Sequence, residues 1–470
     1  MSTKISNLLA FFIATSLGTG TYTTLWSQTV KARRPYIEWS AVPSSSTWQY
    51  GVGDEAEVNV SIRSGGLPAN DIWVHYTVGN DMMQPERQDS VVVREGKATV
   101  SMGVSQKAGF RTCRMWFTAN GNRYEDLVKV GYGVDQIKAY ATMPKDFKSF
   151  WTETIAAARS IDLNPQIEEM ADKSTDRVAA YKVRLTVGLS KGQTRYVYCY
   201  LSIPRDQRRH PVLLVPPGAG VKMDAYSDFY AKEGFVSMSM EIHGMDPDLE
   251  EAEKDSIRGA LRNYMSMGIE SRETYYYRLV YAVCVRAMDY LCSRPEWDGE
   301  HAGVTGGSQG GALSIVTAAL HERVGFVAAF YPALCDVSAY VGGQACGWPR
   351  FFSPVYAGKD KMGEGIGAEI KTKALGTLPY YDVVNFGRML AVPCFASYGH
   401  ADEVCPPTSV AAMLNEVSAP KTIVVTPTSA HWRFAETQAK AIEWMKEQSG
   451  VNGETEGTKT KGDNEILYRD

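Results

Sequence analysis

The chain has 470 residues, of which 44% are hydrophobic and 22% are charged, so it can bury a large core. This composition excludes collagen-like, disordered and small disulfide-scaffold proteins, and the length suggests two or three domains. The 49 Lys and Arg residues against 53 Asp and Glu residues give a net charge of -4. That balance leaves no positive excess for gripping a phosphate backbone, so nucleic acid is not expected as a partner.

The first 27 residues have the layout of a secretory signal peptide. Lys4 lies in a short polar start, an apolar stretch follows from Leu8 to Leu17, and Gly18 to Thr24 is rich in Gly and Thr. The apolar stretch is too short to span a bilayer, and the Gly and Thr residues suit a cleavage region better than the end of a buried first helix. We therefore expect a periplasmic or secreted protein with no membrane span.

The eight cysteines are scattered along the chain without a CxxC pair or a Cys/His cluster at zinc-ligand spacing. No structural metal is predicted from them. An oxidising compartment would permit disulfides, and the sequence leaves their pairing open. Cys113 stands alone in the first third of the chain and is expected to be a buried thiol.

Residues 35–137 are expected to form a small all-β domain. Val58, Val60 and Ile62 alternate with polar residues, as in a half-buried strand, and Asn120-Gly121 between two β-rich runs predicts a hairpin turn. About seven short strands with no helix indicate an immunoglobulin-like β-sandwich. We favour a spacer or interface role for it over sugar binding.

The pattern of residues 138–448 is different and predicts helices that alternate with buried strands. The polar segment 449–470 that follows is expected to be a disordered tail. Predicted helices are Asp146 to Ser160, Tyr275 to Cys292, Ala312 to His321 and Phe434 to Lys446. Predicted strands are Val212 to Val215, Val236 to Met240, Ala302 to Thr305, Val327 to Phe330, Val392 to Ser397 and Thr422 to Thr426. This alternation predicts an α/β fold with a mostly parallel sheet covered by helices on both faces, in which chemistry lies beyond the carboxyl ends of the strands.

Ser308 is the candidate nucleophile. It lies in Gly306-Gly307-Ser308-Gln309-Gly310, a G-x-S-x-G string between a predicted strand and a predicted helix, which is the nucleophile turn of the α/β-hydrolase fold. The backbone N–H of Gln309, at the start of the helix, would point at a developing oxyanion. An incidental serine in a Gly-rich turn is the alternative, and a base and an acid are needed to decide.

The base and the acid are expected to follow the serine in chain order. His321 lies in the helix that follows Ser308 and cannot reach back, so His400 and His431 remain; His431 stands in a loop after the last predicted strand and is favoured. Asp402, directly after the preceding strand, is the favoured acid, with Glu403 as the adjacent rival. A second oxyanion donor is expected in the loop Pro216 to Gly220, and we assign it to the N–H of Ala219.

At this point several strings resemble one known family, the acetyl xylan esterases and cephalosporin-C deacetylases of carbohydrate esterase family 7. They are Tyr275-Tyr276-Tyr277-Arg278, Val285-Arg286-Ala287, Ser293-Arg294-Pro295, the run GVTGGSQGGA from Gly303 to Ala312, and Cys405-Pro406-Pro407. The resemblance covers about residues 140–448 and leaves out the sandwich. It implies that Ser308 is the nucleophile, Asp402 the acid and His431 the base of an esterase that deacetylates acetylated xylo-oligosaccharides and related small esters.

The resemblance also implies that no metal or organic cofactor takes part, and it points to a homo-oligomer because family members often form hexamers. Two turns depart from the family pattern. Pro217-Gly218-Ala219 replaces an H-G-Y turn that commonly supplies the second oxyanion donor, and Glu241 to Met245 replaces an aspartate-arginine turn. Both departures bear on the substrate more than on the chemistry.

Two other functions are alternatives to this one. A serine peptidase of the prolyl oligopeptidase type shares the hydrolase layout, but about 100 residues of β-structure are too few for its propeller. A catalytically dead glycan-binding protein is the alternative from another class, and an intact Ser, Asp and His in order argue against it.

Overall fold

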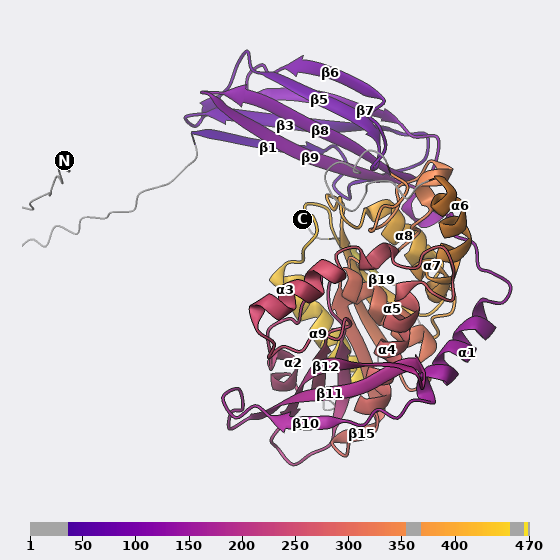
Figure 1. The fold of residues 1–470 in the computed structure, drawn as a ribbon. Coiled ribbons are helices and arrows are strands. Elements are labelled where there is room, and N and C mark those ends of the chain that lie inside the picture. The colour runs from indigo at the N-terminus through magenta and orange to yellow at the C-terminus, as the bar shows by residue number, and fades with distance from the viewer. Residues whose placement is uncertain (1–35, 354–367, 452–464, 469–470) are drawn as a thin grey trace, which may run out of the picture.

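The computed structural model describes residues 36–353, 368–451 and 465–468 (Figure 1). The expected signal peptide at 1–27 lies outside the described residues. Within the described ranges, no helix is long and apolar enough to cross a membrane.

Two sheets come first and enclose one core; their strands pair antiparallel except for a short parallel pairing of the second and ninth strands. Their strands are β1 (Ile37–Pro43), β2 (Gln49–Tyr50), β3 (Glu55–Ser64), β4 (Leu67–Pro68), β5 (Trp73–Asn80), β6 (Arg87–Val92), β7 (Lys97–Val104), β8 (Gly109–Ala119) and β9 (Asn122–Tyr132). One sheet has the order β1-β3-β4 with β7 beside β3, and the other has the order β2-β9-β8-β5-β6. The predicted β-sandwich is confirmed.

The strand pattern explains how the two sheets pack. Every second residue of β3 is buried from Ala56 to Ile62, so one face of the strand carries the apolar side chains. Trp39 of one sheet and Phe117 of the other meet edge to face with ring centroids 5.2 Å apart. Asn120 and Gly121 both have positive φ and form the predicted hairpin turn between β8 and β9.

A ten-stranded sheet is the centre of the second part of the chain, in the order β10-β11-β12-β14-β13-β15-β16-β17-β18-β19. The strands are β10 (Gln166–Glu169), β11 (Val178–Ser190), β12 (Gln193–Pro204), β13 (His210–Val215), β14 (Val236–Met240), β15 (Trp297–Gly307), β16 (Phe326–Phe330), β17 (Cys394–Gly399), β18 (Lys421–Thr426) and β19 (Glu465–Tyr468). Pairing is antiparallel from β10 to β14 and parallel from β14 to β19. Each of the six predicted buried strands overlaps one of β13 to β18.

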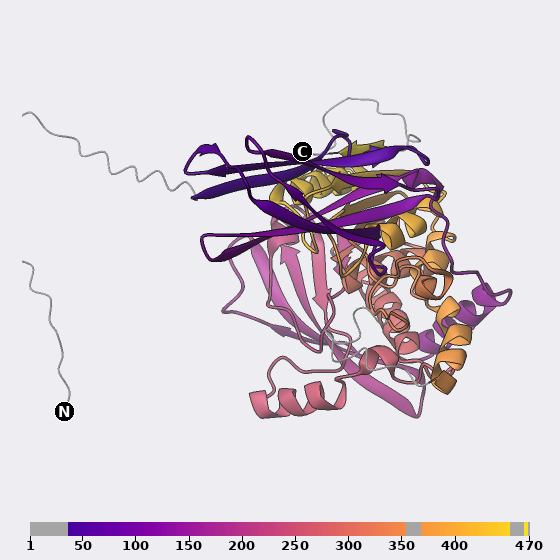
Figure 2. The ribbon, with the colours of Figure 1, turned by 90° about the horizontal axis from the view of Figure 1, so that it is seen from above.

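Helices cover both faces of this sheet, which confirms the predicted α/β-hydrolase fold (Figures 1 and 2). They are α1 (Phe147–Arg159), α2 (Phe229–Lys232), α3 (Glu251–Ala260), α4 (Tyr276–Leu291), α5 (Gln309–Leu320), α6 (Ala368–Thr377), α7 (Val383–Gly387), α8 (Pro407–Asn415) and α9 (Ala435–Ser449), with short 3-10 turns η1 (Val134–Gln136), η2 (Tyr264–Ser266), η3 (Ala339–Gly342) and η4 (Leu378–Tyr380). Val212 and Leu214 of β13 face the core that includes α4 and α5, whereas Leu213 faces the core that includes α9.

The expectation of a disordered tail is wrong for residues 465–468. They form β19, which pairs in parallel with β18 at the edge of the sheet, in the register Thr422 to Glu465. Backbone pairing at an open sheet edge needs no apolar period along the segment, which is why the hydrophobic pattern missed it. The remainder of the tail beyond Val451 lies outside the described residues.

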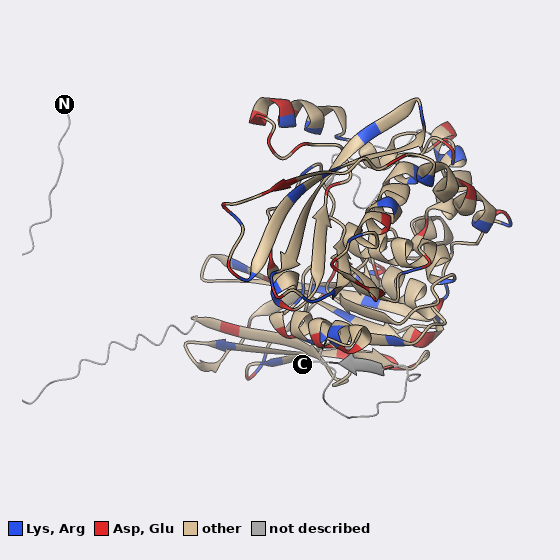
Figure 3. Cartoon of the chain, turned by 90° about the horizontal axis from the view of Figure 1, so that it is seen from below, with Lys and Arg blue, Asp and Glu red and all other residues tan. Residues whose placement is uncertain are grey.

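Charged residues are interspersed along the elements rather than gathered by sign (Figure 3). All eight cysteines lie in the described ranges as free, buried thiols. Cys113 is buried as expected, and burial raises its pKa to about 12. No disulfide therefore contributes to holding these parts of the chain together.

Candidate active site

Ser308 lies at the sharp turn between β15 and α5. Its backbone has φ 59 and ψ -125, a region that L-residues rarely adopt. A Cβ at Gly306 would stand 2.6 Å from the Gly310 carbonyl, and a Cβ at Gly310 would stand 2.5 Å from the Pro216 oxygen. The two glycines of the motif are therefore required by close backbone approach, and the turn holds the serine out at the carboxyl end of the sheet.

Ser308, His431 and Asp402 form one hydrogen-bonded chain. The His431 Nε2 lies 2.9 Å from the Ser308 Oγ, and the His431 Nδ1 lies 2.8 Å from the Asp402 Oδ2. Because a carboxylate only accepts, Nδ1 carries the proton, and Nε2 accepts from the serine hydroxyl. This tautomer is the one that can take a proton from Ser308.

The acid of this chain is held rigidly. Asp402 is fully buried, and its Oδ1 accepts hydrogen bonds from the backbone N–H groups of Val404, at 2.7 Å, and Cys405, at 2.9 Å. These donors compensate the carboxylate for the loss of water. They also leave Oδ2 free to accept from His431.

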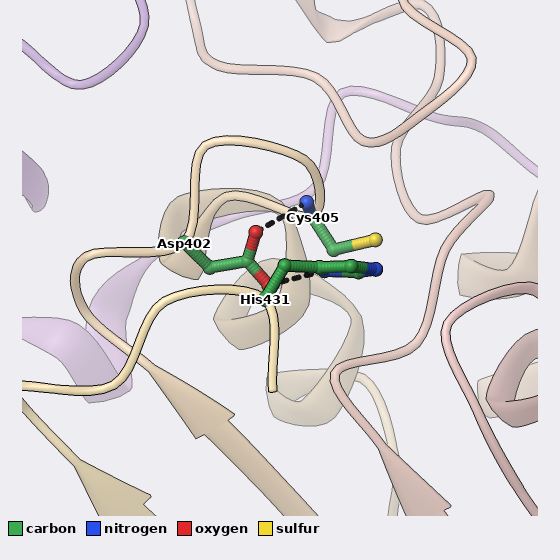
Figure 4. Close-up of side chains that lie close together, drawn as sticks. All are labelled: Asp402, Cys405 and His431. Atoms are coloured by element: carbon green, nitrogen blue, oxygen red, sulfur yellow. Dashed lines mark hydrogen bonds and ion pairs between the residues drawn. The ribbon is translucent and has the colours of Figure 1, made fainter. Parts of the chain in front are cut away.

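Cys405 lies beside this pair, and the three side chains present ligand atoms within 4.8 Å of one another, close enough to hold a metal ion (Figure 4). The carboxylate oxygens and the thiol are, however, not in the states that a metal ligand needs. Both Asp402 oxygens accept hydrogen bonds, as the dashed lines in Figure 4 show. Burial raises the pKa of the Cys405 thiol well above its usual value, so it is a neutral thiol rather than a thiolate ligand. The arrangement is a hydrogen-bonded carboxylate and imidazole with a small buried neighbour.

The two rival residues lie elsewhere. Glu403 forms an ion pair with Arg114 of β8, at 2.7 Å. His400 is fully buried between the sandwich and β17, where its ring contacts Phe110, and desolvation lowers its pKa to about 3. The structure thus brings Ser308, Asp402 and His431 together and places Glu403 and His400 outside that chain.

The loop after β13 is tied to the start of α5 by a buried polar network. The Gln309 side chain donates to the Gly218 carbonyl, at 3.2 Å, and its Oε1 accepts from the hydroxyls of Tyr264, at 2.8 Å, and Tyr277, at 2.7 Å. The Gly220 N–H donates to the Tyr264 oxygen, at 3.3 Å. Ala219 lies between these two anchored glycines, and Gln309 is the first residue of α5.

The chain is similar to known proteins over most of its length. The family model described as acetyl xylan esterase (AXE1) matches residues 131–448. The chain belongs to the acetyl xylan esterase family. It is 36% identical over 442 residues to the acetyl esterase Axe7A of Xylanibacter ruminicola, covering 91% of this chain and 94% of that protein. As a member of this family, the chain is a carboxylic ester hydrolase.

Solved structures of acetyl xylan esterases share the fold. The enzyme from Paenibacillus sp. R4 has a TM-score of 0.56 and 22% identity, covering 67% of this chain and 98% of its own. Acetyl xylan esterase 1 from Thermoanaerobacterium sp. JW/SL YS485 has a TM-score of 0.55 and 22% identity, covering 67% of this chain and 97% of its own. The family match begins at residue 131, after most of the sandwich. The match to Axe7A covers 91% of this chain and therefore includes most of the sandwich strands.

The esterase has a further buried carboxylate that the sequence analysis noted only as a departure from the family pattern. Glu241 accepts hydrogen bonds from the backbone N–H groups of Tyr198, His243, Gly244 and Met245, and it is fully buried. It therefore organises the turn after β14. Burial lowers the pKa of His243 to about 4, and its Nδ1 lies 2.8 Å from the Tyr276 hydroxyl.

Tyr264 and Tyr277 were not among the predicted site residues. Their contacts with Gln309 join segments more than 30 residues apart, for which a single sequence offers no local signal. The only trace is the Tyr275-Tyr276-Tyr277-Arg278 string, which served as a family resemblance and not as a site.

One aromatic ring packs on His431 and another follows it in the chain. Tyr331 packs edge to face on the His431 ring with centroids 4.8 Å apart. Trp432, the residue after His431, contacts Phe434 but remains 46% exposed, so its ring lies at the surface.

Proposed function

We propose that this esterase removes acetyl groups from acetylated xylan, xylo-oligosaccharides or related acetylated sugars by a Ser-His-Asp acyl-enzyme mechanism. The observation that carries the proposal is the unbroken hydrogen-bond chain from Ser308 through His431 to Asp402. A serine hydroxyl is a weak nucleophile at neutral pH, and this chain supplies the base and the group that orients it.

In the first half-reaction, Ser308 Oγ attacks the acetyl carbonyl while His431 Nε2 takes the hydroxyl proton. The carbonyl oxygen becomes an oxyanion that accepts hydrogen bonds from the backbone N–H groups of Gln309 and Ala219. The bond to the sugar oxygen then breaks, and His431 returns the proton to that oxygen. The products are the free sugar hydroxyl and an acetyl group on Ser308.

In the second half-reaction, water attacks the acetyl-serine carbonyl, and His431 takes its proton. Collapse of the second oxyanion releases acetic acid and restores Ser308 with its proton. Asp402 keeps Nδ1 protonated and stabilises the imidazolium in both halves. No cofactor enters either half of this scheme.

Three observations support an acetylated glycan as the substrate. The family model is that of an acetyl xylan esterase, and the relative Axe7A is named an acetyl esterase. Trp432 is an exposed aromatic ring directly after His431, where it could stack on a pyranose. The net charge of -4 suits a neutral substrate, which needs no electrostatic steering.

The decisive experiment compares acetate release from acetylated xylan, acetylated pectin and small acetylated sugars. We expect release from acetylated xylan or xylo-oligosaccharides, and a loss of several powers of ten in kcat for Ser308→Ala. A Ser308→Ala variant with wild-type turnover of an aryl acetate would overturn the mechanism. Glycan binding without any ester turnover would favour the dead binding protein.

We also propose export to the periplasm or medium, because residues 1–27 have the layout of a signal peptide. Fractionation of a bacterium that expresses the full chain, followed by sequencing of the mature N-terminus, tests this. An intact Met1 on protein confined to the cytoplasm would contradict it.

A further inference from the structure

A buried ion pair lies where the sandwich meets the hydrolase. Lys129 of β9 and Asp81, which follows β5, are both almost fully buried, and the Lys129 Nζ lies 2.7 Å from the Asp81 Oδ1. The other Asp81 oxygen accepts from the hydroxyl of Thr408 in α8, at 2.8 Å. The sandwich therefore holds a buried charged pair against the hydrolase, whereas a spacer would need only a solvated contact.

Lys129 holds both ends of one short segment of the hydrolase. Its ammonium donates to the main-chain carbonyl of Asp402, at 2.9 Å. Its own carbonyl accepts from the His400 Nδ1, at 3.1 Å. The segment from His400 to Asp402 is thus clamped to β9 at both ends.

The sandwich also contacts Glu403, the residue that follows this segment. Arg114 of β8 forms its ion pair with Glu403, which directly follows Asp402. In Figures 1 and 2 the sandwich lies against the part of the hydrolase that holds α8. Neighbouring strands of the sandwich, β8 and β9, therefore hold consecutive residues of the loop that carries the acid.

A buried ammonium loses its hydration, so its N–H donors need acceptors within the protein. Asp81 Oδ1 and the Asp402 carbonyl lie within hydrogen-bond distance of Lys129 Nζ, and the Met82 sulfur lies 4.0 Å away. These partners come from both sides of the interface. The Lys129–Asp81 pair lies within the sandwich, whereas the bond to the Asp402 carbonyl forms only when the sandwich is docked, and that bond brings the Asp402 backbone to a defined position.

We propose that the sandwich is a working part of the active site, in which Lys129, held by Asp81, is a positioning residue that sets the Asp402 carboxylate against His431. The proposal rests on the proposed function, since it takes Asp402 to be the acid. Lys129 touches neither substrate nor the reacting atoms, so its effect passes entirely through Asp402.

The test is a double-mutant cycle in the full chain with an aryl acetate as substrate. Lys129→Met removes the ammonium and keeps the length of the side chain, and Asp402→Ala removes the carboxylate. We expect Lys129→Met to lower kcat about tenfold or more with KM unchanged in the wild-type background, and less than about twofold in the Asp402→Ala background. Thermal midpoints of all four proteins are measured alongside.

The outcomes are distinguishable. An equal loss of kcat in both backgrounds would overturn the proposal, since Lys129 would then act on folding alone. No loss of kcat for Asp402→Ala would instead overturn the proposed function. The matched control is Lys97→Met on β7, an exposed lysine of the same sandwich, for which we expect wild-type kcat.

A milder variant covers the case in which Lys129→Met does not fold. Thr408→Val removes only the hydroxyl that donates to Asp81 and leaves the ion pair in place. We expect a loss of kcat of about threefold in the wild-type background that disappears in the Asp402→Ala background. The same factor in both backgrounds would again overturn the proposal.

Discussion

The Tyr264 hydroxyl donates to the Gln309 side chain, at 2.8 Å, and accepts from the Gly220 N–H, at 3.3 Å. One buried phenol thus links the residue after Ser308 to the loop that follows β13. The two proposed oxyanion donors, on Gln309 and Ala219, belong to the two segments that this phenol joins. The distance between these two donors therefore depends on Tyr264, whose hydrogen bonds go to Gln309 and Gly220 and not to Ser308 or His431.

Tyr264→Phe is expected to lower kcat for an aryl acetate about tenfold, because the partly buried Gly220 N–H loses its acceptor, at a cost of about 1 kcal/mol, and the loop relaxes to satisfy it. Steady-state kinetics measure this. The control is Tyr196→Phe on β12, where the ring is 47% exposed. Unchanged kcat for Tyr264→Phe would show that the loop keeps its position without the phenol.

Ser308→Gly is expected to be more stable than Ser308→Ala by about 1 kcal/mol, although both lack activity. The positive φ of residue 308 strains any residue with a Cβ, and glycine relieves that strain. At an ordinary helix or strand position the order is reversed. Chemical denaturation of the two variants decides, and a more stable alanine variant would contradict the strain.

Acid is expected to destabilise the protein through His400. Its pKa is lowered to about 3 in the folded state, whereas an unfolded histidine titrates near 6.5. Below pH 6.5 the unfolded state binds the proton that the folded state refuses, so stability falls as the pH falls. This residue alone should lower the free energy of unfolding by about 2 kcal/mol between pH 7 and pH 5.

The measurement is denaturant unfolding of the wild type and of His400→Asn at both pH values. Asparagine retains a donor near the position of Nδ1 and does not titrate. We expect the fall between pH 7 and pH 5 to be smaller in His400→Asn by about the same 2 kcal/mol. Equal falls in the two proteins would mean that the imidazole is not buried in its neutral form.

Glu241→Gln is expected to destabilise the protein by about 2–3 kcal/mol, because an amide nitrogen would face backbone N–H donors. Both Glu241 oxygens accept such donors, so neither orientation of a glutamine satisfies the site. Glu153→Gln, on the exposed face of α1, is the matched control. Equal unfolding midpoints for the two variants would contradict this account of the turn.

Much of the hydrolase was predictable because its signals are local. The run Ala302 to Thr305 before Gly306-Gly307-Ser308-Gln309-Gly310 predicts a strand, a tight turn and a helix, and β15 and α5 are found there. Asp402 and His431 were favoured because they follow the next strands in chain order. Chain order predicts which strand ends carry the site residues, because parallel strands bring their carboxyl ends to one edge of the sheet.

The sequence by itself determined the fold class and the candidate Ser308, His431 and Asp402, since periodicity and turn chemistry act over a few residues. Only the tertiary structure decided that Glu403 faces Arg114 rather than His431, and that Lys129 holds the Asp402 backbone. These contacts join residues more than 250 positions apart. They depend on how two independently patterned parts dock, because a buried ammonium needs a partner for each donor, and the Asp402 carbonyl reaches Lys129 only from the other part.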